Sequence, residues 1–155
     1  MLTAAAAVTT AQWIGGRWRP TPDQPRTAAR YFSLRKPGFT PPPVAFAAAW
    51  TGLSALLAYS GYRLLTRPSS RARTQALSAW SANLGGIAGF SWIFFGRKQL
   101  GEAFGVTLGM TVAASVAAAT ANRVDRRAGL ATLPLVAYTE FAVLLQEEVW
   151  RRNAK

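Results

Sequence analysis

The sequence predicts an all-α fold, a polytopic membrane bundle of five transmembrane helices of which the first is short. Half of the 155 residues are hydrophobic, and the charged residues (15 %) fall in patches between long apolar runs. A run of about 20 apolar residues is what a helix needs to cross a bilayer. The links between the runs are short, which places consecutive helices side by side and antiparallel. We therefore expect one domain over residues 1–155.

The second expected span, residues 43–65, shows how the sequence marks a helix. Its start is a rigid proline run at 41–43, and Pro43 suits a first helical turn, where its missing N–H costs nothing. Residues 44–62 carry no charge. Trp50 lies about 10 Å along this helix, too far from the end for a headgroup belt. We expect it either to pack against a neighbouring helix or to line a cavity that the proline segment covers.

The remaining spans follow from the other apolar runs, which are residues 1–16, 74–95, 100–121 and 128–150. The first run is short for a bilayer. The first 35 residues are rich in Ala, Thr and Arg, so this run is either a short first span or part of a targeting segment. Residues 19–42 form a proline-rich loop, and its 19–36 part is predicted to be extended rather than helical, because proline disfavours helix in the residue before it.

Small residues recur every four positions in two expected spans. They are Ser81, Gly85 and Gly89 in one, and Gly101, Gly105, Gly109, Ala113, Ala117 and Ala121 in the other. Such ladders let helix backbones approach closely in lipid. We expect them to pack helices within the monomer, with a dimer face as the alternative.

The net charge of +12 is interpreted as membrane-flanking charge and not as a nucleic-acid site, because the basic residues form no continuous face. Five spans place the first loop, the third loop and the C-terminus, including Lys155, on the side richer in Arg and Lys. That bias predicts a cytoplasmic C-terminus. Four tryptophans fall at the same interface, as an aromatic belt would place them: Trp13, Trp18, Trp92 and Trp150.

Cys and His are both missing from the sequence. This excludes disulfides, Cys nucleophiles, His bases and the usual zinc ligands. The lysines have no nucleophilic partner in a motif, and no glycine-rich phosphate loop occurs. We therefore expect no enzyme.

Several short motifs follow one another in an order that is informative as a whole. In chain order they are Trp13-Ile-Gly-Gly-Arg-Trp18, Tyr31, Leu34, Lys36-Pro37, Phe39, Pro41-Pro42, Trp50, Ile93-Phe-Phe-Gly96, Lys98-Gln99, Pro134, Val149-Trp-Arg151 and Asn153. Over nearly the whole chain they resemble the translocator protein family, also known as the TspO/MBR family, the tryptophan-rich sensory proteins or the peripheral-type benzodiazepine receptors.

The resemblance implies a five-helix bundle, often dimeric, with a cavity that opens toward the first loop and binds porphyrins or sterols. It implies no resident cofactor. The host membrane would be mitochondrial in a eukaryote and the inner (cytoplasmic) membrane in a bacterium. The ligand-binding residues that it implies here are Phe46, Trp50, Asn83, Phe90, Tyr138, Ala142 and Leu145, with Phe39, Pro41 and Pro42 as a lid.

The chain departs from the family pattern where ligands are held. Family tryptophans are replaced in the third, fourth and fifth helices, and the sterol-recognition tyrosine is replaced by Glu147. The replacements are Ile87-Ala88-Gly89-Phe90-Ser91, Glu102 and Tyr138. Phe90 and Tyr138 can still stack on a flat ligand. The alternative is a ligand-poor descendant that serves as a structural subunit of a larger membrane complex.

Glu140 supports that alternative. At 100° per residue it falls on the face of its helix opposite Tyr138, near mid-bilayer, where an acid usually faces protein. The other acids of this helix, Glu147 and Glu148, can pair four residues on with Arg151 and Arg152. We expect Glu140 to contact another chain, either a second copy or a different subunit.

Overall fold

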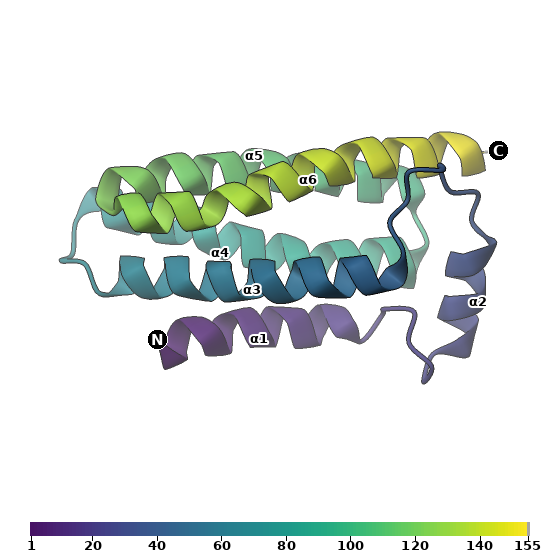
Figure 1. Ribbon diagram of the computed structural model, residues 1–155, viewed down its shortest axis with the longest axis horizontal. Coiled ribbons are helices and arrows are strands. Elements are labelled where there is room, and N and C mark those ends of the chain that lie inside the picture. The colour runs from purple at the N-terminus through teal and green to yellow at the C-terminus, as the bar shows by residue number, and fades with distance from the viewer. Residues whose placement is uncertain (155) are drawn as a thin grey trace.

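The computed structural model describes residues 1–154, and its helices account for nearly all of that range. Lys155 of the predicted C-terminal basic group lies outside the described residues. The elements are α1 (Leu2–Gly16), α2 (Pro25–Ser33), α3 (Pro43–Leu65), α4 (Arg71–Ser91), the π-helical turn η1 (Trp92–Arg97), α5 (Leu100–Val124) and α6 (Arg126–Asn153). The helices α1, α3, α4, α5 and α6 run along the long axis, and α2 stands across one end (Figure 1). The all-α prediction is confirmed, and α3, α5 and α6 are long and apolar enough to cross a membrane.

The helix starts follow from local chemistry. Pro43 begins α3 at its first position, as predicted. Ser70 caps α4, because its hydroxyl accepts a hydrogen bond from the Arg73 N–H at 3.1 Å. Asp125 caps α6 by accepting from the N–H groups of Arg127 and Ala128 at 2.8 and 3.1 Å. Both caps lengthen their helices by a few residues beyond the apolar runs, which explains why the predicted spans were short at these ends.

The prediction of an extended segment between residues 19 and 36 is wrong for α2. Pro25 stands at the first helical position, where proline is compatible with a helix, and no proline follows until Pro37. The proline argument therefore holds for the residues before Pro25 and not for those after it. α2 lies against η1 and covers that end of the bundle (Figure 1).

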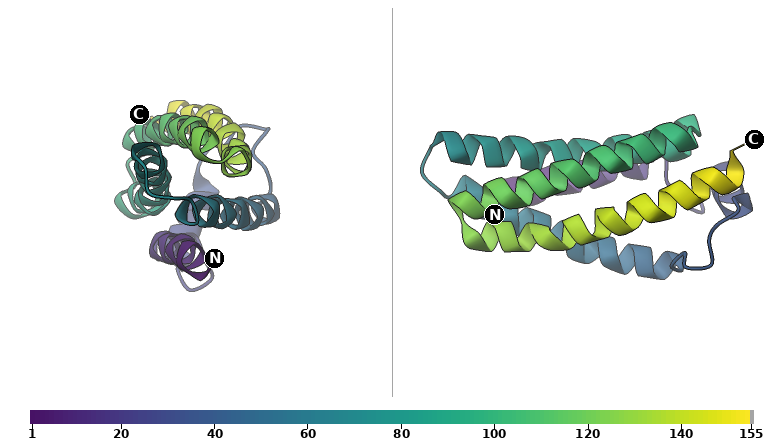
Figure 2. Two further views of the ribbon diagram at one scale, coloured as in Figure 1. Left: turned by 90° about the vertical axis from the view of Figure 1, so that its left-hand side faces the viewer. Right: turned by 90° about the horizontal axis from the view of Figure 1, so that it is seen from above.

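The long helices form a bundle with α1 at its edge. α1 packs against α3 and α4, whereas α5 packs against α4 and α6. Figure 2 shows α5 and α6 together at their link and farther apart at the end that carries α2. The C-terminus lies at that same end (Figure 1).

The core between α3 and α4 depends on one close approach. The indole N–H of Trp80 donates to the Leu57 carbonyl at 3.0 Å. Gly61 makes room for the ring, because a Cβ there would lie 2.6 Å from a Trp80 carbon. From the same turn of α3, the Ser60 hydroxyl donates to the Ala128 carbonyl of α6 at 3.1 Å. Each buried polar group thus joins two helices.

One carboxylate ties together the two links at the end far from α2. Asp125, in the link between α5 and α6, has a side chain only 2 % exposed. Its Oδ2 accepts from the guanidinium of Arg63, with Nη2 at 2.7 Å, and from that of Arg67. These contacts and its two helix-capping bonds hold the pKa of Asp125 far below its ordinary value, although its burial acts in the opposite sense.

The small-residue ladders face outward over much of their length. Gly101 packs on the Trp150 ring, but a Cβ at Gly85, Gly89, Gly105 or Gly109 would meet no other helix within 4 Å. Packing within the monomer is therefore the wrong interpretation at these four positions. The dimer face stays a prediction.

Candidate functional site

A cavity of about 410 Å³ lies inside the α2 half of the bundle. Its walls come from α3, α4, η1, α5 and α6, and the segment 17–42 closes its end. The volume falls in the range of roughly 300–1,000 Å³ found for small-molecule sites. Most of the lining is apolar, and the aromatic residues that contribute to it are Tyr31, Phe46, Trp50, Phe90, Phe94, Phe95 and Tyr138.

Two aromatic pairs shape the cavity. Trp50 of α3 meets Tyr138 of α6 edge to face, with ring centroids 5.1 Å apart. Phe90 and Phe94 are stacked, with centroids 5.4 Å apart and planes within 9°. Trp50 thus satisfies both interpretations of the sequence, since it packs on a neighbouring helix and lines a cavity. Flat faces of this kind suit a flat, largely apolar ligand.

An aromatic series continues from the cavity to α2. Phe95 meets Phe94 and Tyr31 edge to face, with centroids at 4.7 and 5.8 Å. Burial raises the pKa of Tyr31, so this phenol stays neutral at physiological pH. Lys36 places its Nζ 4.2 Å from the centre of the Tyr31 ring. The loop and α2 therefore close the cavity with aromatic and cationic groups.

Two cations from the loop line the cavity, Arg19 and Lys36. Burial lowers the pKa of both side chains, because each has lost part of its hydration. Arg19 is positioned by Gln12 of α1, whose Oε1 accepts from the guanidinium and whose Nε2 donates to the Ser54 hydroxyl at 3.1 Å. A negatively charged group on a ligand would restore the interactions that water no longer provides.

Polar groups also occur deeper in the cavity. Thr107 and Thr139 line it, but their hydroxyls are satisfied by carbonyls of their own helices at 2.8 and 2.9 Å. Gln146 differs, because its buried amide nitrogen has no hydrogen-bond partner among the described residues. That donor is available to an acceptor on a bound molecule.

The loop that closes the cavity is fastened to the C-terminal end of α6. Asn153 accepts from the Arg35 N–H at 3.0 Å and donates to the Arg35 carbonyl at 2.9 Å. Trp18 packs on Gly96 of η1, where a Cβ would lie 2.9 Å from the indole. These contacts hold the segment over the end of the bundle.

Most of the predicted ligand-binding residues line this cavity, namely Phe46, Trp50, Phe90, Tyr138, Ala142 and Leu145. Asn83 does not. It is buried in the bundle, donates to the Ala79 carbonyl at 2.9 Å and leaves its own carbonyl oxygen unpaired. One residue on a helix shifts a side chain by 100°, so position along a motif is a weak guide to which face it occupies.

The predicted lid is displaced from the cavity. Phe39 is 52 % exposed and packs against Phe141 on the outside of α6, with ring centroids 6.3 Å apart. Pro41 and Pro42 are not in the lining either, whereas their neighbours Thr40 and Pro43 are. The proline run directs the chain into α3, and the earlier part of the segment does the covering.

The acidic residues of α6 agree in part with the sequence predictions. Glu140 is exposed, and its carboxylate forms no ion pair among the described residues. Glu148 pairs with both Arg151 and Arg152 at 2.8 Å. The expected pair between Glu147 and Arg151 is absent, because Arg151 is already engaged by Glu148 one residue closer.

Sequence reasoning missed the polar and cationic part of the lining: Arg19, Lys36, Thr107, Thr139 and Gln146. Arg19 and Lys36 were not predicted to line the cavity, because every basic residue of the loop was interpreted as membrane-flanking charge, although Lys36 also belongs to the family pattern. Gln146 did give one, since an amide between Leu145 and Glu147 shares a helix stripe with Tyr138, Ala142 and Val149.

A sequence model of the TspO/MBR family matches residues 3–151, almost the whole chain. The chain belongs to the TspO/MBR family. Among relatives, it is 28 % identical over 123 residues to a tryptophan-rich sensory protein of Cereibacter sphaeroides, covering 79 % of this chain and 76 % of the relative. It is also 28 % identical over 126 residues to protein CrtK of Rhodobacter capsulatus (81 % and 79 %). It is 30 % identical over 126 residues to the translocator protein of Ovis aries (79 % and 74 %).

Membership of the TspO/MBR family agrees with the apolar helices and makes the chain a membrane protein. The match runs through α1 and the closing loop as well as through the long helices, so the parts that bound the cavity belong to the family domain. Arg19 and Lys36 line the cavity, together with the Gln146 amide that has no partner among the described residues.

Proposed function

We propose that this TspO/MBR family protein binds a flat hydrophobic molecule, a tetrapyrrole or a sterol, in the cavity between its helices. The observation that carries the proposal is the cavity of about 410 Å³ whose aromatic faces include Trp50 and Tyr138. It supports a binding function because the space is bounded by helices, lined by rings and of the size found for small-molecule sites. The proposal assigns no chemical reaction to the protein.

The two cations of the closing loop favour an anionic ligand. A tetrapyrrole with carboxylate side chains would place its ring against Trp50 and its carboxylates near Arg19 and Lys36, where charge-assisted hydrogen bonds are strongest. A sterol carries no such charge. We therefore propose the tetrapyrrole as the better fit.

The test is a titration of the purified protein with protoporphyrin IX, followed by quenching of tryptophan fluorescence. Trp50→Ala should weaken binding by about 1–3 kcal/mol, by analogy with the stacking of bases on aromatic side chains. Trp92→Ala is the control, because Trp92 is exposed and lies outside the lining. Equal affinity for Trp50→Ala and wild type would remove Trp50 from the site, and failure to saturate would overturn the proposal.

Charge is tested separately. Arg19→Gln and Lys36→Gln should each weaken protoporphyrin IX by several fold and leave the affinity for cholesterol unchanged. Equal losses for both ligands would show that these residues act on the shape of the cavity and that the preference for an anionic ligand is wrong.

A second candidate function rests on Glu140. An exposed acid near the middle of a membrane helix favours contact with a polar or basic group of another chain. We propose that the protein is then a subunit of a homodimer or of a larger membrane assembly. Glu140→Leu should shift the particle isolated in mild detergent to smaller mass while its helix content stays unchanged. The same mass for both proteins would exclude this contact.

The topology that accompanies the proposal is five crossings by α1, α3, α4, α5 and α6. α1 has 15 residues, about 22 Å at 1.5 Å each, so it crosses only a thinned or locally bent bilayer. The host membrane would be mitochondrial in a eukaryote and cytoplasmic in a bacterium.

A further inference from the structure

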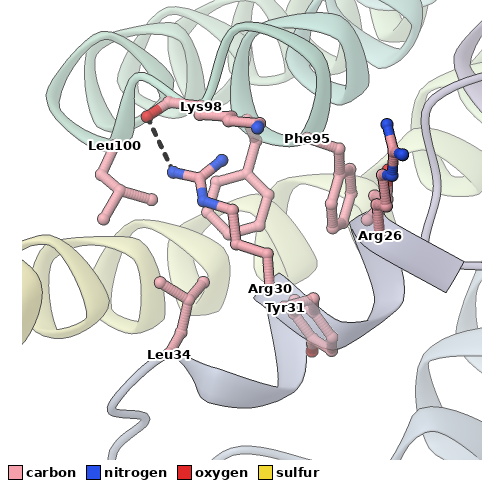
Figure 3. Close-up of a pocket in the computed structure, with 9 residues that line it drawn as sticks. Arg26, Arg30, Tyr31, Leu34, Phe95, Lys98 and Leu100 are labelled. Carbon is pink, nitrogen blue, oxygen red and sulfur yellow. Dashed lines mark hydrogen bonds between the residues drawn. The ribbon is translucent and has the colours of Figure 1, made fainter.

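A second, much smaller pocket lies outside the cavity, between α2 and the junction of η1 with α5 (Figure 3). Its volume is about 60 Å³. Tyr31, Leu34, Phe94 and Phe95 contribute to both spaces and form the wall between them. The residues that belong to the small pocket alone are Arg26, Thr27, Arg30, Lys98 and Leu100.

Three cations share this pocket without a carboxylate. Arg26 and Arg30 come from successive turns of α2, and Lys98 comes from the link before α5, as Figure 3 shows. None of the ion pairs among residues 1–154 includes any of the three. Asp23 lies three residues before Arg26 and forms no ion pair among residues 1–154, and Glu102 is paired with Arg97 at 3.6 Å. Like charges placed together repel unless an anion joins them.

One of the three cations, Arg30, is held in position by a hydrogen bond, whereas Arg26 and Lys98 are exposed. Arg30 donates one guanidinium hydrogen bond to the Lys98 carbonyl at 3.1 Å (Figure 3), which leaves its other N–H groups for a ligand. Lys98 adopts a left-handed backbone, with φ at 65°, where the chain turns sharply between η1 and α5. Burial also lowers the pKa of Arg30, because it disfavours the charged form of the side chain.

The end of the bundle that holds the pocket also carries exposed tryptophans. Trp13 and Trp92 are exposed, with the guanidinium groups of Arg17 and Arg97 at 4.0 and 5.3 Å from their ring centres. Exposed tryptophans under arginines are typical of the membrane interface. Beside the cations, the pocket wall has an apolar part that is formed by Leu34, Phe94 and Leu100.

We propose that this pocket binds the phosphate of an anionic membrane phospholipid. At roughly 10–15 Å³ for each water-sized group, the space holds about four to six such groups, which suits a phosphate with its four oxygens. Arg26, Arg30 and Lys98 bind the phosphate oxygens, and the apolar wall receives the start of the acyl chains. A free phosphate ion satisfies the cations equally but has nothing to place against Leu34 and Leu100.

The test is native mass spectrometry of the full chain in mild detergent with added phosphatidylglycerol or phosphatidylcholine. Wild type should retain one phosphatidylglycerol in preference to phosphatidylcholine. Neutralising one cation near a membrane surface costs about fivefold in affinity, so Arg26→Gln should lose about fivefold and the triple Gln variant of Arg26, Arg30 and Lys98 roughly a hundredfold.

The control is the triple Gln variant of Arg123, Arg126 and Arg127, three exposed arginines at the opposite end of the bundle. It removes the same charge and should retain the lipid. Equal loss in both triple variants, or no loss with Arg26→Gln, would overturn the site. Inorganic phosphate at millimolar concentration should not displace the lipid, and displacement would overturn the choice of lipid over free phosphate. Quenching by protoporphyrin IX should be unchanged in Arg26→Gln, because Arg26 does not line the large cavity.

Discussion

Replacing Asp125 by alanine should destabilise the bundle by about 2 kcal/mol. The side chain caps α6 through two backbone N–H groups, and loss of such a cap costs about 1 kcal/mol. It also receives two guanidinium groups, from Arg63 and Arg67, which are 22 % and 41 % exposed. Because water reaches both arginines, the loss of the carboxylate charge adds only about 1 kcal/mol, as for exposed pairs.

The measurement is the midpoint of thermal unfolding in detergent, followed by circular dichroism. A loss of about 2 kcal/mol should lower the midpoint by about 4–8 °C for a chain of this length. Asp125→Asn is the matched control, since asparagine caps a helix as well as aspartate but carries no charge. It should show about half the loss of Asp125→Ala.

The effect of pH checks the same reasoning. The folded pKa of Asp125 lies below its unfolded value of about 3.9, so its charge contributes fully above about pH 5 and is lost as pH falls below about 4. The difference in midpoint between wild type and Asp125→Asn should therefore narrow on acidification. An unchanged midpoint for Asp125→Ala at pH 7 would refute the assignment of Asp125 as a stabilising clamp.

Two further predictions concern the core and the topology. Gly61→Ala should cost about 1–3 kcal/mol, because the added Cβ would lie 2.6 Å from the buried Trp80 ring, and wild-type stability in thermal unfolding would contradict this. The chain has no Cys, so single variants Ser33→Cys and Ala154→Cys report sidedness, and an impermeant thiol reagent should label both from the same side of the membrane. Labelling from opposite sides would exclude five crossings.

The long helices were predictable because apolar runs and proline starts are local signals. Pro43 sets the start of α3 by its own chemistry. α2 was missed because the prolines of the loop were taken together as a signal for extended chain. The position of Pro25 was not considered, although proline favours the first turn of a helix that begins there. The ends of α4 and α6 depend on Ser70 and Asp125, whose capping role a hydropathy pattern does not contain.

Only part of the aromatic lining could be predicted from the sequence. Tyr31, Phe94 and Phe95 were not assigned to the site, and neither was its polar part. Trp50 and Tyr138 were identified by position in the family pattern, and the structure brings their rings together. Arg19 and Lys36 reach the cavity only because the loop folds back over the bundle. That fold depends on tertiary packing, which a local sequence pattern does not show. Asn83 was assigned to the site from its place in a motif, but its helical phase turns it elsewhere.

The contacts of Asp125 constrain one end of the bundle more than the other. At that end a single side chain locks two links, whereas at the other end the loop is held to α6 by Asn153 and a few aromatic contacts. We therefore expect any separation of α5 from α6 to be smallest at their link and largest at the α2 end.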